Sequence, residues 1–212
     1  MQSYGSDGAH RVNEVEDALW QAHISMAFGK TEFSYYTYWP ILNTTDGLLE
    51  DRTYPLTRFG EKTPAWYSVQ RANAELVYNG KYLLHFEYKD STYIHKTPMP
   101  TGISCLNGLK RPVEYTKLGE IVIDEPSLYF KGQAGGGIIV TELYDAENEQ
   151  LGYYVCNITD PIVDSEAVVT LSFPNFNNIQ IVENLTTSNI ALADHTFTFE
   201  LGTGRGAFIM PY

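Results

Sequence analysis

The stretch Ile138-Ile-Val-Thr-Glu-Leu-Tyr-Asp-Ala-Glu-Asn-Glu-Gln-Leu-Gly-Tyr-Tyr-Val-Cys-Asn-Ile-Thr159 joins two runs of apolar and aromatic residues through a polar tip. The runs are residues 138–144 and 153–159, and the tip extends from Asp145 to Gly152. β-Branched and aromatic residues favour strands, and a short polar connection is typical of antiparallel neighbours. The stretch therefore predicts a β-hairpin.

The rest of the C-terminal part repeats this pattern of short strands between turn residues. No helical period is found there, and residues 85–119 form a less regular connector. Many short strands at such spacing are typical of an antiparallel sandwich or barrel. Residues 85–212 are therefore predicted to form a C-terminal antiparallel β-sandwich domain. Besides the hairpin, the predicted strands are residues 120–123, 127–131, 167–173, 179–182, 195–201 and 207–210.

Residues 1–84 contain two predicted helices. Asn13 as N-cap, with Glu16 three residues later, predicts the start of the first helix, and Gly29 its end. Thr63-Pro64 predicts the start of the second helix, and Asn79-Gly80 its end. Apolar residues at spacings of three and four form one stripe on each helix. The stripes are Val15, Ala18, Leu19, Ala22 and Met26 in the first helix, and Ala65, Val69, Ala72 and Leu76 in the second.

A strand is predicted between these helices, in Glu32-Phe-Ser-Tyr-Tyr-Thr-Tyr-Trp39. Aromatic residues occur at both odd and even positions of this stretch, which indicates a strand that is covered on both faces. A polar loop follows at residues 43–62. Alternating strands and helices are typical of a parallel α/β unit. The predicted fold class is therefore α+β, with partial βα units in residues 1–84 before the β-sandwich.

Charge and composition exclude several classes of partner. The 212-residue chain has 14 basic and 26 acidic residues and a formal net charge of −12, so neither nucleic acid nor a membrane surface is an expected partner. The histidines and cysteines show no metal-ligand spacing, and no helix follows the glycine-rich segments, so no metal or cofactor is expected. The N-terminal residues 1–5 lack the basic, apolar and cleavage regions of a secretory signal, so a cytoplasmic location is expected. Cys105 and Cys156 are expected to be two buried thiols, with one disulfide as the alternative.

Aromatic residues crowd the carboxyl end of the predicted strand 32–39. In parallel α/β folds ligands bind at this end. Flat aromatic rings stack on the apolar faces of sugars, while nearby amides and carboxylates bond the hydroxyl groups. Packing between the strand and the helices is the alternative role of each ring. The predicted substrate-binding residues are Gln2, Tyr4, Tyr36, Tyr38, Trp39 and Asp46.

Several segments of the chain resemble a known enzyme class. Met1-Gln-Ser-Tyr-Gly5, Ala18-Leu-Trp-Gln-Ala-His-Ile-Ser-Met-Ala-Phe-Gly29 and Phe33-Ser-Tyr-Tyr-Thr-Tyr-Trp39 resemble the last two strand–helix units of a (β/α)₈ glycoside hydrolase of the β-galactosidase-like type, such as family 42. Residues 60–76 look like the final barrel helix, and residues 153–159 and 197–208 look like strands of the C-terminal β-domain. The resemblance implies carbohydrate as the partner and a barrel remnant in residues 1–84, as in the C-terminal fragment of a longer enzyme.

The resemblance also implies a catalytic deficit. Such enzymes use two carboxylates about 5 Å apart, at the ends of the fourth and seventh barrel strands. No fourth strand is found, and the segment that corresponds to the seventh offers Gln2 and Tyr4 but no glutamate. The catalytic residues are therefore unknown, and we expect the isolated chain to be an inactive relative of the glycoside hydrolases.

Two further expectations concern the rest of the molecule. The alternative function is a non-catalytic carbohydrate-binding or assembly module formed by the β-sandwich. Two βα units cannot close a barrel, so their inner faces are expected to be covered by a second copy of the chain or by the β-domain, or else to make the chain poorly soluble. The aromatic residues that the alternative function would use are Tyr129, Phe130, Tyr144, Tyr153, Tyr154 and Phe176.

Overall fold

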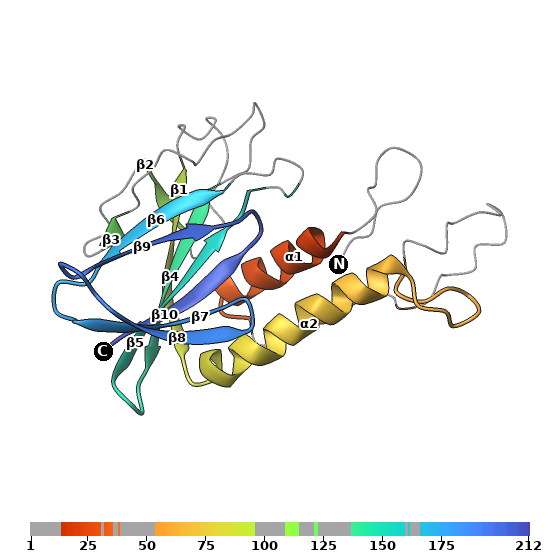
Figure 1. Ribbon diagram of the computed structural model, residues 1–212, viewed down its shortest axis with the longest axis horizontal. Coiled ribbons are helices and arrows are strands. Elements are labelled where there is room, and N and C mark those ends of the chain that lie inside the picture. The colour runs from red at the N-terminus through yellow and green to blue at the C-terminus, as the bar shows by residue number, and fades with distance from the viewer. Residues whose placement is uncertain are drawn as a thin grey trace.

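The described part of the molecule has three layers. A computed structural model describes residues 14–30, 32–35, 38, 54–95, 109–114, 121–122, 137–159, 161 and 166–212. Two helices form one layer, a seven-stranded sheet forms the middle layer and a three-stranded sheet forms the third (Figure 1). The predicted class, mixed α+β with mostly antiparallel sheets, is confirmed.

The seven-stranded sheet has the order β2-β1-β4-β5-β10-β7-β8, and the three-stranded sheet has the order β3-β6-β9. Among the strands that the structure describes, only β1 and β2 pair in parallel. The helices are α1 (Val15–Ala27) and α2 (Pro64–Leu83). The strands are β1 (Glu87–His95), β2 (Leu109–Glu114), β3 (Ile121–Val122), β4 (Ile138–Asp145), β5 (Gln150–Asn157), β6 (Ala167–Ser172), β7 (Asn178–Glu183), β8 (Thr186–Ala191), β9 (Thr196–Leu201) and β10 (Gly206–Pro211).

The predicted hairpin of residues 138–159 is present as β4 and β5, which pair along their whole length from Ile138–Asn157 to Asp145–Gln150. Asp145 fixes the tip, because its carboxylate accepts hydrogen bonds from the backbone N–H groups of Glu147 (2.9 Å) and Asn148 (3.2 Å). The polar tip thus closes the turn by a side-chain cap.

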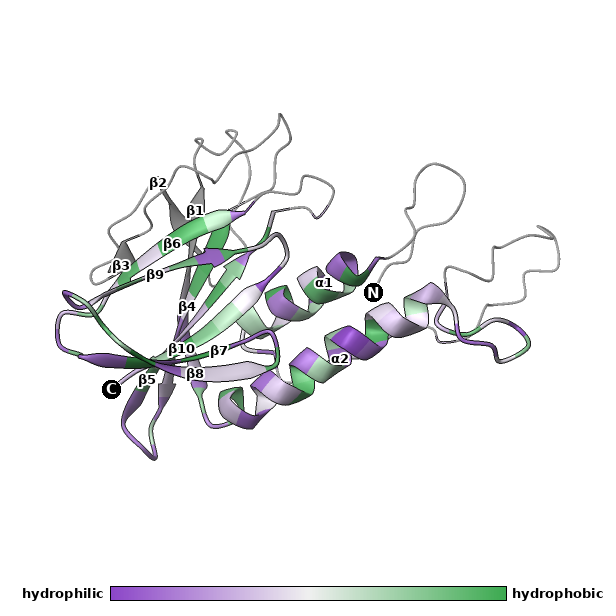
Figure 2. Ribbon diagram, viewed as in Figure 1, coloured by the Kyte–Doolittle hydropathy of each residue, from purple (hydrophilic) through white to green (hydrophobic). Residues whose placement is uncertain are grey.

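Apolar residues fill the spaces on both sides of the middle sheet. One core lies between the two sheets and includes Val155, Val169 and Ile209. A second core lies between the middle sheet and the helices and includes Met26, Tyr154 and Phe208. Because both faces are covered, every residue of β10 is buried, and β4, β6 and β10 carry much of the apolar colour in Figure 2. No helix in the described ranges is long and apolar enough to cross a membrane.

The two helices lie side by side and run in the same direction (Figure 1). Ala18 and Ala22 of α1 meet Ala72 of α2, and His23 of α1 meets Glu75. Later residues of α1 therefore contact later residues of α2, as expected for parallel helices. The small side chains at this interface allow a close approach, and α1 also contacts β4, β5 and β10.

The predicted limits of the helices are partly correct. Thr63 is the N-cap of α2 with Pro64 at its first position, and Gly29 follows α1 with a φ of 65°, as expected. The predicted cap of α1 is wrong by one residue: Glu14 is the N-cap, and Asp17 accepts a hydrogen bond from the Glu14 N–H at 3.1 Å.

The predicted end of α2 at Asn79-Gly80 is also wrong. The side chain of Asn79 donates to the carbonyl of Glu75 within the helix (2.9 Å), so Asn79 does not act as a stop. The helix continues to Leu83 because Tyr82 and Leu83 pack on the core beneath it.

In the described part of the chain, three strands were not expected from the sequence, and one expected strand has another conformation. The expected strand 127–131 lies outside the described residues. Strands β1 and β2 lie in the region interpreted as a connector, and β8 is a polar edge strand. Residues 32–35 and 38, the described part of the predicted strand 32–39, have no strand conformation. Their aromatic rings instead contact one another and α2. The strand prediction is wrong for these residues, because packing on the helix replaces sheet pairing.

Candidate functional site

Of the predicted substrate-binding residues, Tyr38 is described by the structure. Gln2, Tyr4, Tyr36, Trp39 and Asp46 lie outside the described residues. Tyr38 is half-buried, and its backbone carbonyl accepts a hydrogen bond from the Leu56 N–H at 3.1 Å. This bond ties the aromatic segment to the residues that lead into α2.

Tyr38 lines a cavity of about 190 Å³ on the first half of α2. The other lining residues are Trp66, Val69, Gln70 and Asn73. They recur at spacings of three and four, which places them on one face of the helix. The cavity therefore combines an aromatic wall, an aliphatic floor and two amide side chains.

The aromatic wall is a continuous series of rings. The ring centroids of Tyr35 and Tyr38 lie 6.1 Å apart, and those of Tyr38 and Trp66 lie 6.2 Å apart. Both pairs meet edge to face, an arrangement that aromatic quadrupoles favour. The Tyr35 hydroxyl donates to Oδ1 of Asn73 at 2.8 Å. Burial, with a smaller contribution from Tyr38, raises the pKa of Tyr35, so its hydroxyl keeps its proton and remains a donor.

Hydrogen-bond donors and a cation lie beside this wall. The indole N–H of Trp66 is buried, and no residue in the described part of the chain accepts its hydrogen bond. The ammonium group of Lys62 lies 4.9 Å from the centroid of the Trp66 ring. A buried donor that lacks an acceptor costs free energy.

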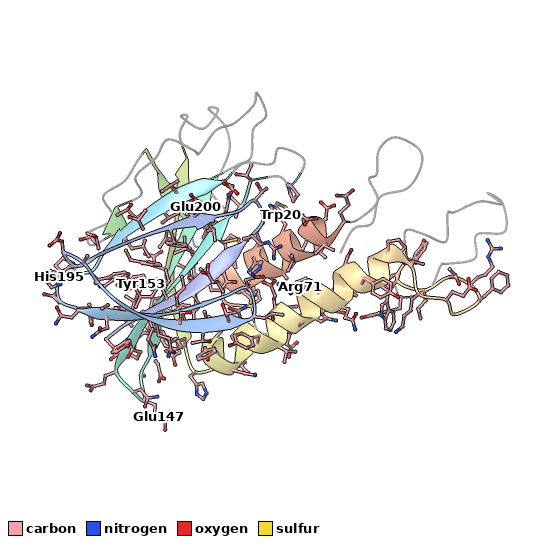
Figure 3. The ribbon with its side chains drawn as sticks, in the orientation of Figure 1. Trp20, Arg71, Glu147, Tyr153, His195 and Glu200 are labelled. Carbon is pink, nitrogen blue, oxygen red and sulfur yellow. The ribbon has the colours of Figure 1, made fainter. Side chains whose placement is uncertain are left out.

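A second polar cluster lies deeper, between the helices and the middle sheet. His23 lies 2.9 Å from Glu75 through Nε2 and 2.6 Å from the Tyr154 hydroxyl through Nδ1. The other carboxylate oxygen of Glu75 accepts from Arg71 at 2.6 Å and from Arg205 at 3.1 Å. In Figure 3, Arg71 is labelled on α2. His23, Glu75 and Tyr154 are almost fully buried, so this cluster joins the layers and offers a substrate no access.

The described aromatic residues among those considered for the alternative function do not form a sugar-binding face on the sheets. Tyr153, labelled in Figure 3, belongs to the core between the two sheets, and Tyr154 belongs to the core between the middle sheet and the helices. Phe176 packs against the core between the sheets, and Tyr144 lies under the ammonium group of Lys89. Tyr129 and Phe130 lie outside the described residues.

Metal and thiol chemistry find no support in the described ranges. No group of three or more histidine, cysteine, aspartate or glutamate side chains there could hold a metal ion. Cys156 is a buried free thiol, as expected, and Cys105 lies outside the described residues.

Sequence reasoning identified Tyr38 but missed Trp66, Gln70 and Asn73. These three residues lie beside the apolar stripe from which α2 was predicted. Their spacing of four and three residues was visible in the sequence and would have indicated a common helix face.

Comparison with known proteins adds no family assignment: no protein-family model and no curated protein matches the chain.

Proposed function

We propose that the chain is a fragment of a glycoside hydrolase-like protein and that the cavity of Tyr38 and Trp66 binds a sugar ring. The observation that carries this proposal is the combination of two aromatic rings with the amides of Gln70 and Asn73 around one cavity. Aromatic faces suit the C–H faces of a sugar, and amides both donate to and accept from hydroxyl groups.

The size of the cavity supports a small ligand. Its volume of about 190 Å³ lies below the roughly 300–1,000 Å³ of sites for drug-sized molecules. We therefore propose that it holds one sugar ring, as the end of a chain or as a monosaccharide.

The direction of the helices supports the barrel part of the proposal. In a (β/α)₈ barrel, each parallel strand is followed by a helix, so neighbouring helices run in the same direction. The helices α1 and α2 do so (Figure 1), although residues 32–35 and 38 between them form no strand, and the cavity lies on the first half of α2. Ligands of such barrels bind beside the N-terminal ends of the helices, because the strands end there.

The cavity does not supply the chemistry of hydrolysis by itself. Glycoside hydrolysis uses two carboxylates, and none of the described residues that line the cavity carries one. We therefore propose that the isolated chain binds sugar without turnover.

The proposal is tested by titration with neutral galacto-oligosaccharides, followed by calorimetry, and by a panel of nitrophenyl glycosides. Trp66→Ala should abolish binding, because it removes one wall of the cavity. Tyr67→Ala is the matched control, since Tyr67 is the next residue on α2 but is 56% exposed and outside the cavity. Equal binding by both variants would refute the assigned site, and absence of any binding by the wild-type chain would refute the function.

A further inference from the structure

The helix α2 has two different sides. Its inner side packs on α1 and on the core of the middle sheet through Ala72, Glu75 and Leu76. In Figure 1, α2 lies at the outside of the described molecule. Six exposed residues follow its other side at spacings of three and four, and we call them the outer stripe: Tyr67, Gln70, Ala74, Val77, Lys81 and the C-cap residue Leu84.

The outer stripe is mainly apolar, yet it is open to solvent. Tyr67, Val77 and Leu84 are 56%, 69% and 67% exposed, and Ala74 between them is exposed as well. Single apolar residues on a surface are ordinary, but a row of them along one helix face is typical of a contact surface. The outer stripe therefore indicates a surface that another molecule covers.

The residue types of the outer stripe have the same order from both ends. Each half begins with a large apolar residue, continues with a long polar residue and ends at the centre with a smaller aliphatic residue. The halves are Tyr67, Gln70 and Ala74 from one end, and Leu84, Lys81 and Val77 from the other. A two-fold interface brings the same surface of two copies together, so this surface must be complementary to itself. Two antiparallel α2 helices, with the axis between residues 75 and 76, would place large apolar residues against each other at both ends.

The charge around α2 also favours a second copy as the partner. The chain has a net charge of −12, but residues 54–95 contain five of its 14 basic residues and only four of its 26 acidic ones. The single acidic residue of α2, Glu75, lies on the inner side and is 1% exposed. Lys81 is the one charged residue of the outer stripe, and the antiparallel arrangement would separate its two copies by about 16 Å along the helices, twice the screening length of about 8 Å at physiological salt. Repulsion between two acidic chains is therefore weak at this surface, whereas a basic partner would find few carboxylates there.

We propose that two copies of the chain associate through the outer stripe, with their α2 helices antiparallel about a two-fold axis beside Ala74 and Val77. The small side chain of Ala74 lets the helices approach closely at the centre. Stable interfaces bury roughly 1,200 Å² or more, and a single pair of helices, each about 30 Å long, offers a smaller contact. The dimer is therefore reversible, and its population rises with protein concentration. This association does not depend on sugar binding.

Analytical ultracentrifugation of the full chain over a wide range of concentrations tests the association. Val77→Lys should weaken it at least about tenfold, because two lysines would meet beside the axis in place of two aliphatic side chains. Val77 is 69% exposed, so the variant should fold, and circular dichroism checks this. The matched control is Tyr212→Lys, which introduces the same charge at an apolar residue that is 52% exposed but lies outside α2, and it should associate like the wild type.

Disulfide cross-linking tests the antiparallel orientation in a Cys105→Ser chain, whose remaining thiol, that of Cys156, is buried. An antiparallel pair would place the two copies of residue 77 about 4–5 Å apart along the helices and the two copies of residue 67 about 25 Å apart. Mild oxidation should therefore link Val77→Cys into dimers and leave Tyr67→Cys unlinked, although both positions are exposed.

Three results would overturn the proposal. The first is a wild-type chain that stays monomeric at every concentration. The second is a dimer of unchanged strength in Val77→Lys, which would place the interface elsewhere. The third is efficient cross-linking of Tyr67→Cys, which would show that the helices do not pair in the antiparallel arrangement.

Discussion

The Nε2 atom of His23 on α1 lies 2.9 Å from a carboxylate oxygen of Glu75 on α2, and each of the two side chains is only 1% exposed. Arg71 and Arg205 bind the other oxygen of the same carboxylate, and His23 reaches Tyr154 of β5 through its second ring nitrogen. A single buried carboxylate thus joins both helices to the middle sheet. An unpaired buried charge is costly, so the stability of Glu75 requires its partners from both helices and from the middle sheet to be in place together.

Replacement of this carboxylate should destabilise the protein strongly. In Glu75→Gln, two arginines and a histidine lose the negative charge and one of the two acceptor oxygens that they share, so we expect a loss of about 2–4 kcal/mol in the free energy of unfolding. Urea denaturation followed by circular dichroism measures this loss. Glu200→Gln is the control: Glu200 is exposed on the outer sheet, and its replacement should change stability by less than about 0.5 kcal/mol. Similar losses in the two variants would contradict a central role of Glu75.

The same carboxylate should shape the pH dependence of stability. Burial alone would raise the pKa of Glu75, but contacts with His23, Arg205 and Arg71 together hold the pKa below its ordinary value of 4.5. The folded protein therefore binds a proton on Glu75 less tightly than the unfolded chain does, so the ionised carboxylate stabilises the fold above pH 4.5. This stabilisation is lost as the pH falls below 4.5. Urea midpoints measured between about pH 3 and 6 should therefore fall less steeply with acid in Glu75→Gln than in the wild type.

Glu183 should have the opposite effect. Burial raises the pKa of Glu183, so its ionisation favours the unfolded chain as the pH rises above the ordinary value of 4.5. Glu183→Gln removes this opposing contribution, and the stability of the variant should rise more steeply with pH than that of the wild type. Identical pH profiles of the wild type and both glutamine variants would show that neither group titrates differently on folding.

Local patterns in the sequence predicted the features that depend on local interactions. The hairpin of residues 138–159 was visible because both strands and the closing turn lie within one short stretch, and Thr63-Pro64 marked a helix start for the same reason. Strands β1 and β8 were missed because their sequences are largely polar and their pairing with β4 and β7 decides their conformation. Packing across the fold overrides local propensity in such strands.

The candidate site was also hard to predict because its residues come from distant parts of the chain. Tyr38 was found because it lies in a run of aromatic residues, but its neighbour Trp66 comes from α2. The role of Glu75 was not visible either, since its partner Arg205 comes from the other end of the chain. A charged residue next to an apolar stripe is ordinarily exposed; only the packed layers show that this one is buried.

The thiol of Cys156 should be unreactive until the protein unfolds. Its side chain is fully buried in the core under the helices, and burial raises the pKa of the thiol well above its ordinary value. In a Cys105→Ser chain, Cys156 is the only thiol, and Ellman's reagent should react with it at the rate of unfolding. As a positive control, Glu147→Cys in the same background places a thiol on the exposed hairpin tip (Figure 3), where it should react at once. Fast reaction of Cys156 in the native state would contradict its burial.

Two glycine-to-alanine changes should shift stability in opposite directions. A Cβ atom at Gly206 would lie 2.8 Å from Nδ1 of His23 and 2.8 Å from the Tyr154 hydroxyl oxygen, so Gly206→Ala should push these groups apart. Overpacking of this kind costs about 1–3 kcal/mol. At Gly80 of α2, no atom lies within 4 Å of the added Cβ, and Gly80→Ala should stabilise the protein by about 0.5–1 kcal/mol because alanine favours the helix. Urea denaturation of both variants separates the two effects, and a stabilised Gly206→Ala chain would show that β10 does not approach α1 so closely.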